Sequence, residues 1–238
     1  MARLAESDYR KALEVLYTAG EADGWLAFPE PVLLALSDLV ACDVVTFHER
    51  SADRDRVLVY AGEPIGELTP EIRAAHRRLT HQDPTRPSDG ARTLTDFISM
   101  REFRRRDFYT LVHRPLGIEY MLQLYLDPSR TDARLEFDRS DRDFTERDRT
   151  VLDRILPHLR QFLRLARQRR DTVTTALTSR EHEVIEHVAL GRTNDEIARV
   201  LGISPATVRK HLENVYERLD VHTRTGAVAA VRGFARPG

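Results

Sequence analysis

Apolar residues in the first 143 positions follow two different periods along the chain. A helical period of three and four residues predicts helices at 8–19, 29–41, 70–79 and 99–108. Runs rich in valine, leucine and aromatic residues predict strands at 44–48, 57–61, 118–126 and 135–138. Strict alternation over 118–126 is typical of a strand with one buried face, which we expect to pair with 135–138. This order of elements predicts an α+β fold, with a central antiparallel sheet flanked by helices.

A long helical pattern connects this part to the rest of the chain. It begins at Phe144, with Thr145 as its N-cap, and Pro157 inside it is expected to kink the helix. Its apolar positions alternate by three and four, which is a coiled-coil spacing, at Leu152, Ile155, Leu159, Phe162 and Ala166. The polar, threonine-rich residues 171–175 are expected to form a linker. We therefore divide the chain into 1–143, 144–175 and 176–238, and we expect the middle part to dimerise the protein.

Two helix-start signals stand close together in the last part. Thr193 and Glu196 form a capping box at the start of a short helix. Gly202 ends that helix, because glycine takes the left-handed conformation without a steric penalty. Ser204 then caps a second helix, whose first position is Pro205. A helix, a tight glycine turn and a second capped helix are the signature of a helix-turn-helix unit.

The segment from Leu177 to Val231 resembles the LuxR-type (also called FixJ/NarL-type) DNA-binding domain. The matching residues lie in one unbroken register: Leu177, Thr178, Arg180, Glu181, Val184, Ile185, Gly191, Asn194, Glu196, Ile197, Ala198, Leu201, Ser204, Thr207, Val208, His211, Asn214, Leu219, Val221, Arg224 and Ala227. The resemblance implies an all-α domain of four helices and a bacterial, sequence-specific DNA-binding transcription regulator. It also implies that the last helix, 224–234, contributes a dimer contact, although Gly226 stands where the family commonly has glutamate.

The second helix, Pro205–Leu219, is expected to lie in the major groove of double-stranded DNA. Its inward face recurs at four, three and four positions, at Val208, Leu212, Val215 and Leu219. By likeness to the family, Arg209, Lys210 and Glu213 approach base edges. Arg209 is the best candidate for a bidentate contact with guanine, while Glu213 either accepts from a cytosine amino group or repels phosphate. A symmetric dimer predicts an inverted-repeat operator.

Each candidate for phosphate contact either lies at a helix N-terminus or carries a hydroxyl, imidazole or cationic side chain near the second helix. They are Thr193, Asn194, Ser204, Thr207, His211, Arg218 and Arg224. Thr193 and Ser204 are caps in any case, and capping alone is their alternative role. A structural or orienting role is the interpretation that we favour for His211.

The N-terminal part resembles the GAF-like sensor domains that precede LuxR-type domains in many actinobacterial regulators. Two runs carry the resemblance, TLTDFISMREFRRRDFYTLVHRPLGIEYMLQLYL and RSDRDFTERDRTVLDRILPHL. It implies modulation by a ligand or a partner, which the sequence does not identify. Aromatic residues are the candidates for lining a pocket, with ordinary core packing as the alternative: Trp25, Phe47, Tyr60, Phe97, Phe103, Tyr109 and Tyr120.

The charge balance favours DNA binding less strongly than the motif does. The chain has 37 lysine and arginine residues against 38 aspartate and glutamate residues, a net charge of −1. A basic surplus is the usual footprint of a nucleic-acid binder, so positive charge must be local here, as at Arg209 and Lys210. The alternative function is therefore a protein-interaction or assembly module that has lost strong DNA affinity.

Composition and motifs exclude several other classes. Cys42 is the only cysteine, which excludes intrachain disulfides and cysteine-ligated zinc. With Lys11 and Lys210 as the only lysines, the chain lacks the late-strand lysine of a phosphoacceptor receiver domain. Nucleotide-binding and hydrolase motifs are missing, so we expect no enzyme activity, no cofactor and no metal. No apolar run approaches the ~20 residues that span a bilayer, and the N-terminus is charged, so a cytoplasmic protein is expected.

Overall fold

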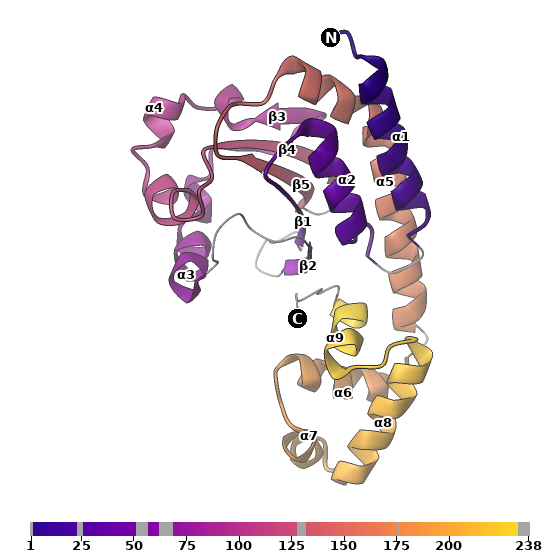
Figure 1. Cartoon of the computed structure of the whole chain (residues 1–238). Coiled ribbons are helices and arrows are strands. Elements are labelled where there is room, and N and C mark those ends of the chain that lie inside the picture. Colours follow the sequence, from indigo (N-terminus) through magenta and orange to yellow (C-terminus); the bar gives the residue numbers. More distant parts are fainter. Residues whose placement is uncertain are drawn as a thin grey trace.

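The computed structural model describes residues 2–22, 26–50, 57–61, 69–127, 132–175 and 177–232. A mixed helix-and-sheet unit precedes a smaller helical unit, and one long helix leads from the first to the second (Figure 1). The elements of the first unit are α1 (Glu6–Gly20), α2 (Glu30–Val40), β1 (Val44–Arg50), β2 (Val57–Ala61), α3 (Pro70–Leu79), η1 (Thr80–Gln82), β3 (Ala91–Thr93), η2 (Leu94–Asp96), α4 (Met100–Phe103), η3 (Tyr109–His113), β4 (Tyr120–Asp127) and β5 (Asp132–Arg139). The elements that follow are α5 (Glu146–Thr175), α6 (Ser179–Ala189), α7 (Asn194–Leu201), α8 (Pro205–Arg218) and α9 (Arg224–Arg232).

The described strands form one antiparallel sheet in the order β2-β1-β5-β4-β3. Leu135 of β5 lies opposite Phe47 of β1 and Leu124 of β4, so the predicted pairing of 118–126 with 135–138 is confirmed. Strand β3 was not predicted, because its three residues are too few to show an apolar alternation. The predicted central antiparallel sheet with flanking helices is confirmed in this coarse form.

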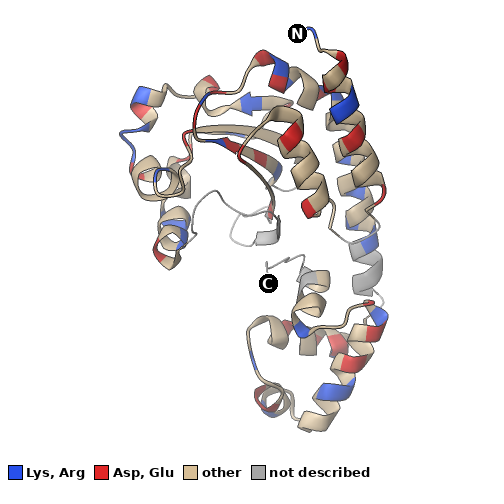
Figure 2. Cartoon of the chain, viewed as in Figure 1, with Lys and Arg blue, Asp and Glu red and all other residues tan. Residues whose placement is uncertain are grey.

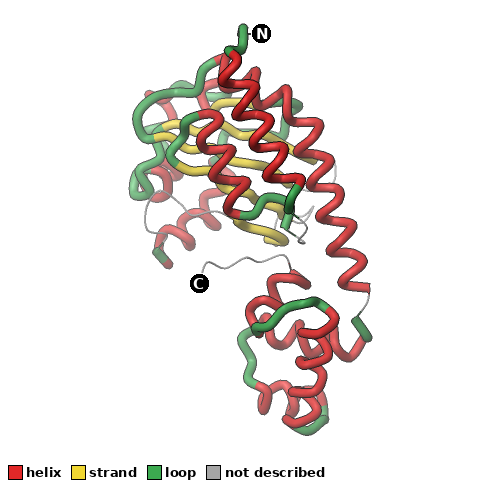
Figure 3. The backbone as a smooth tube through the Cα atoms, turned by 45° about the vertical axis from the view of Figure 1, so that its right-hand side comes forward, coloured by secondary structure: helices red, strands yellow, loops and turns green. Residues whose placement is uncertain are grey.

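Helices α1, α2 and α5 lie side by side over one face of the sheet (Figure 3). Phe47, Leu135 and Phe137 of the sheet are buried in one core with apolar residues of these helices. In α5 the core positions are Leu152, Ile155, Leu159 and Ala166, and Phe162 is partly buried beside them. The apolar residues of α5 that have coiled-coil spacing therefore pack against other elements of the same chain. A dimer formed through α5 would need another face of that helix.

Strand β4 is buried on both faces, so the prediction of a half-buried strand is wrong. Met121 of β4 belongs to a second apolar cluster, with Phe103 of α4, Phe108 and Val112. Helices on both sides of the sheet leave β4 no solvent face. The helix predicted at 99–108 is also different, because α4 ends at Phe103 and a separate π-type turn, η3, follows.

Helix α5 continues without interruption from Glu146 to Thr175. Pro157 lies inside it and does not end it. The residues predicted as a linker, 171–175, form its last turns, so that prediction is wrong. The polar, threonine-rich composition favoured a linker there. Extending a helix that has already formed is easier than starting one, because each added residue gains a backbone hydrogen bond. Within the described residues, no helix is long and apolar enough to cross a membrane.

A buried polar network joins the end of α2, the end of β5 and the start of α5. The Arg139 guanidinium donates to the carbonyl oxygens of Val40, Ala41 (3.2 Å) and Asp143 (3.1 Å), and it pairs with the Asp148 carboxylate at 3.3 Å. Asp148 also accepts from the backbone N–H of Thr145 at 2.9 Å, which caps α5. Arg139 is only 2% exposed, so these partners, in place of water, stabilise its buried positive charge.

Candidate nucleic-acid interface

The C-terminal unit begins with three helices that each have a side-chain cap. Thr178 and Glu181 form a capping box on α6, and Thr193 and Glu196 form one on α7. The Ser204 hydroxyl accepts from the backbone N–H of Thr207 at 3.1 Å, which caps α8. The box on α6 was not predicted, although a threonine followed three residues later by glutamate is its usual sequence signal.

The turn between α7 and α8 has the predicted geometry. Gly202 has φ of 65° and ψ of 35°, which is the left-handed conformation that favours glycine. Beyond it, Ile203 donates through its backbone N–H to the carbonyl of Ala198 at 3.0 Å. The helix-turn-helix arrangement predicted from the two caps and this glycine is confirmed.

One side of α8 is buried in the core of the C-terminal unit. Val208, Leu212, Val215 and Leu219 pack there with Val184 and Ile185 of α6 and Ile197 of α7. The predicted inward stripe is therefore confirmed. Because it fixes the rotation of α8 about its axis, the residues between its members are directed away from the core.

Arg209, Lys210 and Glu213 occupy the outward side of α8 and are exposed. Within the described part of the chain, no hydrogen bond or ion pair engages their charged groups. Basic and acidic residues are interspersed along α8 (Figure 2). The exposed side of this helix can therefore offer both hydrogen-bond donors and a carboxylate acceptor to a ligand.

The hydroxyl groups predicted to contact phosphate lie at helix N-termini, where those of Thr193 and Ser204 act as caps. Thr193 accepts from the backbone N–H of Glu196 at 3.3 Å, and its own hydroxyl donates to the Glu196 carboxylate at 3.0 Å. The hydroxyl groups of Ser204 and Thr207 share a hydrogen bond of 2.8 Å. All three threonine and serine side chains nevertheless stay exposed at the ends of α7 and α8.

Three other phosphate candidates are engaged within the unit. Arg224 donates to the Asn194 side-chain oxygen at 2.9 Å and to the carbonyl of Arg192, so it joins α9 to the start of α7. Arg218 pairs with the Glu181 carboxylate at 3.3 Å. His211 is half-buried on α8. Arg218 remains exposed on one side, whereas Arg224 is largely occupied by its two partners.

Glu181 contributes to the structure of this unit, a role that the sequence did not reveal beyond the family resemblance. Burial by itself raises the pKa of its carboxyl group, but the hydrogen bonds from Thr178 and the charge of Arg218 outweigh burial. The pKa of Glu181 therefore lies below its ordinary value, and the carboxylate is ionised at neutral pH. In this state it holds the start of α6 against the end of α8.

Helix α9 has an incomplete cap. Thr223 accepts from the backbone N–H of Gly226 at 2.9 Å, but glycine has no carboxylate to return the bond, as Glu181 and Glu196 do. Helix α9 contacts α6, α8 and also α5. The last two residues of the predicted helix 224–234 lie outside the described residues.

The aromatic residues predicted to line a ligand pocket are not brought together. Phe47 packs edge-on against Phe28, with 4.9 Å between ring centroids, under the helices on one side of the sheet. Phe103 and Tyr109 contact each other at 5.7 Å in the cluster on the other side. Tyr120 packs against the first core and Phe97 is exposed. Trp25 and the side chain of Tyr60 lie outside the described residues.

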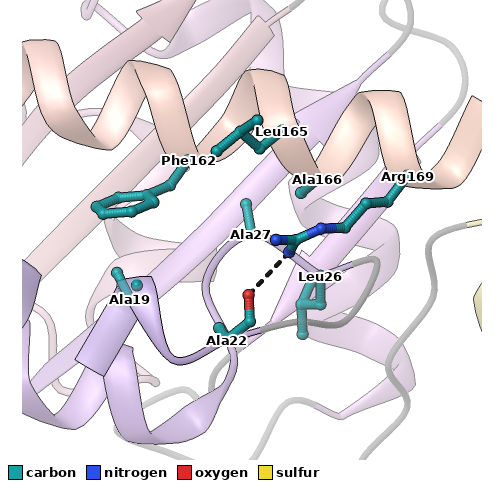
Figure 4. A pocket seen from close by; sticks show the side chains of 9 residues that line it. Ala19, Ala22, Leu26, Ala27, Phe162, Leu165, Ala166 and Arg169 are labelled. Atoms are coloured by element: carbon teal, nitrogen blue, oxygen red, sulfur yellow. Dashed lines mark hydrogen bonds between the residues drawn. The ribbon is translucent and has the colours of Figure 1, made fainter. Parts of the chain in front are cut away.

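A small pocket does occur between the end of α1 and α5 (Figure 4). Ala19, Leu26, Phe162 and Ala166 line it, and Arg169 donates across it to the carbonyl of Ala22 at 2.8 Å. None of the predicted pocket residues contributes to this lining in the described part of the chain.

Comparison with known proteins identifies the class of the C-terminal unit. Residues 175–231 match the family model described as bacterial regulatory proteins, luxR family. The capped helices, the left-handed glycine turn and this match define the unit as a luxR-type helix-turn-helix unit.

Two regulators and one solved structure are similar to the chain. The monoamine regulon transcriptional regulator of Klebsiella aerogenes is 28% identical over 150 residues, which cover 62% of this chain and 66% of the regulator. The HTH-type transcriptional activator RamA of Corynebacterium glutamicum is 48% identical over 59 residues, which cover 25% of this chain and 21% of the activator. A structure of SdiA in complex with octanoyl-rac-glycerol has a TM-score of 0.49 and 17% identity over 97% of both chains.

The chain spans less than two thirds of the length of these two regulators. Both are transcription regulators by name, which supports DNA-binding transcription regulation as the function of the matched C-terminal unit. The likeness of the N-terminal unit to GAF-like domains stays a prediction.

Proposed function

We propose that this chain is a DNA-binding transcription regulator, which reads its operator through α8 and is modulated through its N-terminal unit. The observation that carries the proposal is the outward side of α8, where Arg209 and Lys210 are exposed and have no partner in the described chain. A major groove is wide enough to admit one helix, and a charged side chain without an intrachain partner breaks no ion pair or hydrogen bond within the protein when it turns to a base or phosphate.

Within this proposal, Arg209 reads a base pair and Glu213 restricts which base pair is accepted. An arginine fork matches the two acceptors of guanine, and a carboxylate suits a cytosine amino group or repels phosphate. The helix N-termini of α7 and α8 carry the phosphate contacts, because their remaining backbone N–H groups and helix dipoles favour anions. Two copies of the chain would read an inverted repeat.

The salt dependence of binding separates this proposal from the alternative of a protein-interaction module. We expect affinity for a DNA duplex to fall about 1,000-fold between 50 and 200 mM salt, as for roughly six phosphate contacts released from a duplex. Fluorescence anisotropy with the full chain measures this change, and a random duplex of equal length is the control. Undetectable binding at 50 mM salt, or binding that does not change with salt, would favour the interaction module.

A polar and buried side of the sheet supports modulation through the N-terminal unit. Arg134, Glu136 and Asp138 of β5 lie on the side opposite the α1–α2–α5 core, with Gln123 of β4. Arg134 and Gln123 contact Glu136 at 3.4 and 3.0 Å. Buried polar groups that are not fully hydrogen-bonded cost stability, and proteins commonly retain such a cost where it serves function.

The pKa values of the two carboxyl groups on this side are shifted in opposite directions. Burial alone would raise the pKa of Glu136, but the charge of Arg134 holds it below its ordinary value. For Asp138, burial and the negative charge of Glu136 both raise the pKa well above its ordinary value. One oxygen of Asp138 is buried and, among the described residues, has no hydrogen-bond partner. A polar ligand with a donor group would complete this site.

Replacing Asp138 by asparagine is expected to stabilise the protein at pH 7. Because the pKa of Asp138 is higher in the folded chain than in the unfolded chain, wild-type stability declines as the pH rises above about 4. Asparagine cannot ionise and escapes this loss. Urea unfolding at both pH values should show the variant more stable at pH 7 and nearly equal to wild type near pH 4.

The exposed Asp141 provides the control for this comparison. Its side chain is largely in solvent, so Asp141→Asn should change stability little at either pH. An Asp138→Asn variant that is less stable than wild type at pH 7 would contradict a raised pKa for Asp138 in the folded chain.

A further inference from the structure

Helix α1 carries a row of exposed apolar side chains along its outer side. Tyr9, Leu13 and Tyr17 are 54%, 66% and 71% exposed, and their spacing of four residues places them on one side of the helix. Other large apolar side chains with such exposure stand singly in the described part of the chain: Leu34, Phe97, Leu111, Leu190 and Val200. Tyrosine and leucine in one exposed row are characteristic of a protein interface rather than of a solvated surface.

The chain itself leaves this row uncovered. Asp8, Ala12, Val15 and Ala19 form the opposite, buried side of α1. Helices α2 and α5 contact α1 from its two sides, which leaves its outer side to solvent (Figure 3). Since the apolar stripe of α5 is already buried, α1 offers the exposed helical surface through which two copies can meet.

We propose that α1 of a second copy of this chain packs antiparallel on this row, with a twofold axis close to Leu13. Leu13 then meets Leu13 of the second copy, and Tyr9 meets Tyr17 of the second copy at both ends. This interface goes beyond DNA recognition and does not depend on it. It also supplies the twofold axis that an inverted repeat requires.

The charges beside the row are complementary in this arrangement. Arg10 and Glu14 lie on the same edge of α1, next to the row, and both are exposed; Arg10 also pairs with Glu6 of its own helix at 3.5 Å. A twofold axis perpendicular to two antiparallel helices brings equal edges together. Arg10 therefore lies beside Glu14 of the second copy, and symmetry repeats the pair. A parallel pairing would instead place Arg10 and Glu14 of the second copy on opposite edges of the interface, where they could not pair.

The size of the row is consistent with a reversible dimer. A helix of 15 residues is ~22 Å long, which suffices for one helix–helix contact. Two tyrosines and a leucine, partly exposed, offer roughly half of the ~800 Å² that each partner contributes to a standard interface. Arg10, Glu14 and the partly buried Leu16 extend the contact. We therefore expect a dimer that forms at micromolar concentration.

Sedimentation equilibrium of the full chain, without DNA, tests the interface. Wild-type protein at tens of micromolar is expected to be dimeric, and Leu13→Arg is expected to be monomeric. Leu13 is largely exposed, so the variant should fold, which circular dichroism verifies. The matched control is Leu190→Arg, because Leu190 is 62% exposed but lies next to α6 in the other unit. It should leave the dimer intact.

A charge exchange tests the antiparallel register. Arg10→Glu and Glu14→Arg should each weaken the dimer at least tenfold, because each places like charges beside one another twice. The double variant restores opposite charges and should return the dissociation constant to within a few-fold of wild type. A monomeric wild type, a dimeric Leu13→Arg variant, or a double variant as weak as the single ones would overturn the proposal.

Discussion

Replacing Arg209 by alanine is expected to weaken binding to the operator roughly 10- to 100-fold (~1–3 kcal/mol), with a much smaller effect on random DNA. The α8 core stripe directs Arg209 outward, and no partner in the described chain competes for its guanidinium. A bidentate contact with guanine is lost with the side chain, so base preference should relax at that position alone. Anisotropy titrations at one salt concentration, against an operator selected from random duplexes, measure both affinities.

Arg101→Ala is the matched control for this measurement. Arg101 is an exposed arginine of α4 in the N-terminal unit, so its removal changes the net charge equally without altering α8. It should change neither affinity by more than a few-fold. Equal losses on operator and random DNA for Arg209→Ala would instead assign Arg209 to phosphate contact, since phosphate contacts carry no direct sequence information.

Replacing Arg139 by methionine is expected to destabilise the N-terminal unit by about 3–5 kcal/mol, enough to unfold a marginal domain. Methionine retains much of the volume but leaves the carbonyl of Ala41 without its buried partner, and Asp148 keeps only Arg147, at 3.0 Å, of its two arginine partners. The cation–π contact with Phe144, at 4.1 Å, is lost as well. Urea unfolding followed by fluorescence suits this test, because Trp25, the only tryptophan, belongs to this unit.

A variant of a nearby exposed arginine separates the effect of burial from the effect of losing a charge in that experiment. Arg142 pairs with Asp141 at 2.9 Å, but both side chains are about 60% exposed. Arg142→Met should therefore cost less than ~1 kcal/mol. If the two variants lost similar stability, the buried network around Arg139 would contribute no more than a surface ion pair.

Signals confined to a few residues predicted the C-terminal unit well. The capping box at Thr193, the turn at Gly202 and the cap at Ser204 each depend on atoms within four residues, so the sequence contains the whole interaction. The inward stripe of α8 followed from the helical period for the same reason. The exposure of Arg209 and Lys210 could be predicted because that stripe leaves them only the opposite side.

Contacts between distant segments could not be predicted in the same way. The link between Arg224 and Asn194 joins residues 30 positions apart, and no periodicity signals it. The apolar spacing of α5 was compatible with a coiled coil and with a helix packed on a sheet, and only the sheet decides between them. Likewise, the alternation over 118–126 predicted a strand with one solvent face, whereas the α3–α4 side of the fold covers that face.

The unbroken course of α5 would allow it to act as a lever between the two units. Thirty helical residues extend ~45 Å, and the first half of this rod is anchored to the sheet. A tilt of about 5° at the anchored end moves the far end by ~4 Å, close to the ~3.4 Å between neighbouring base pairs. If α5 moves as one body, a displacement too small to alter the sheet's pairing would shift the helix-turn-helix unit by about one base-pair step.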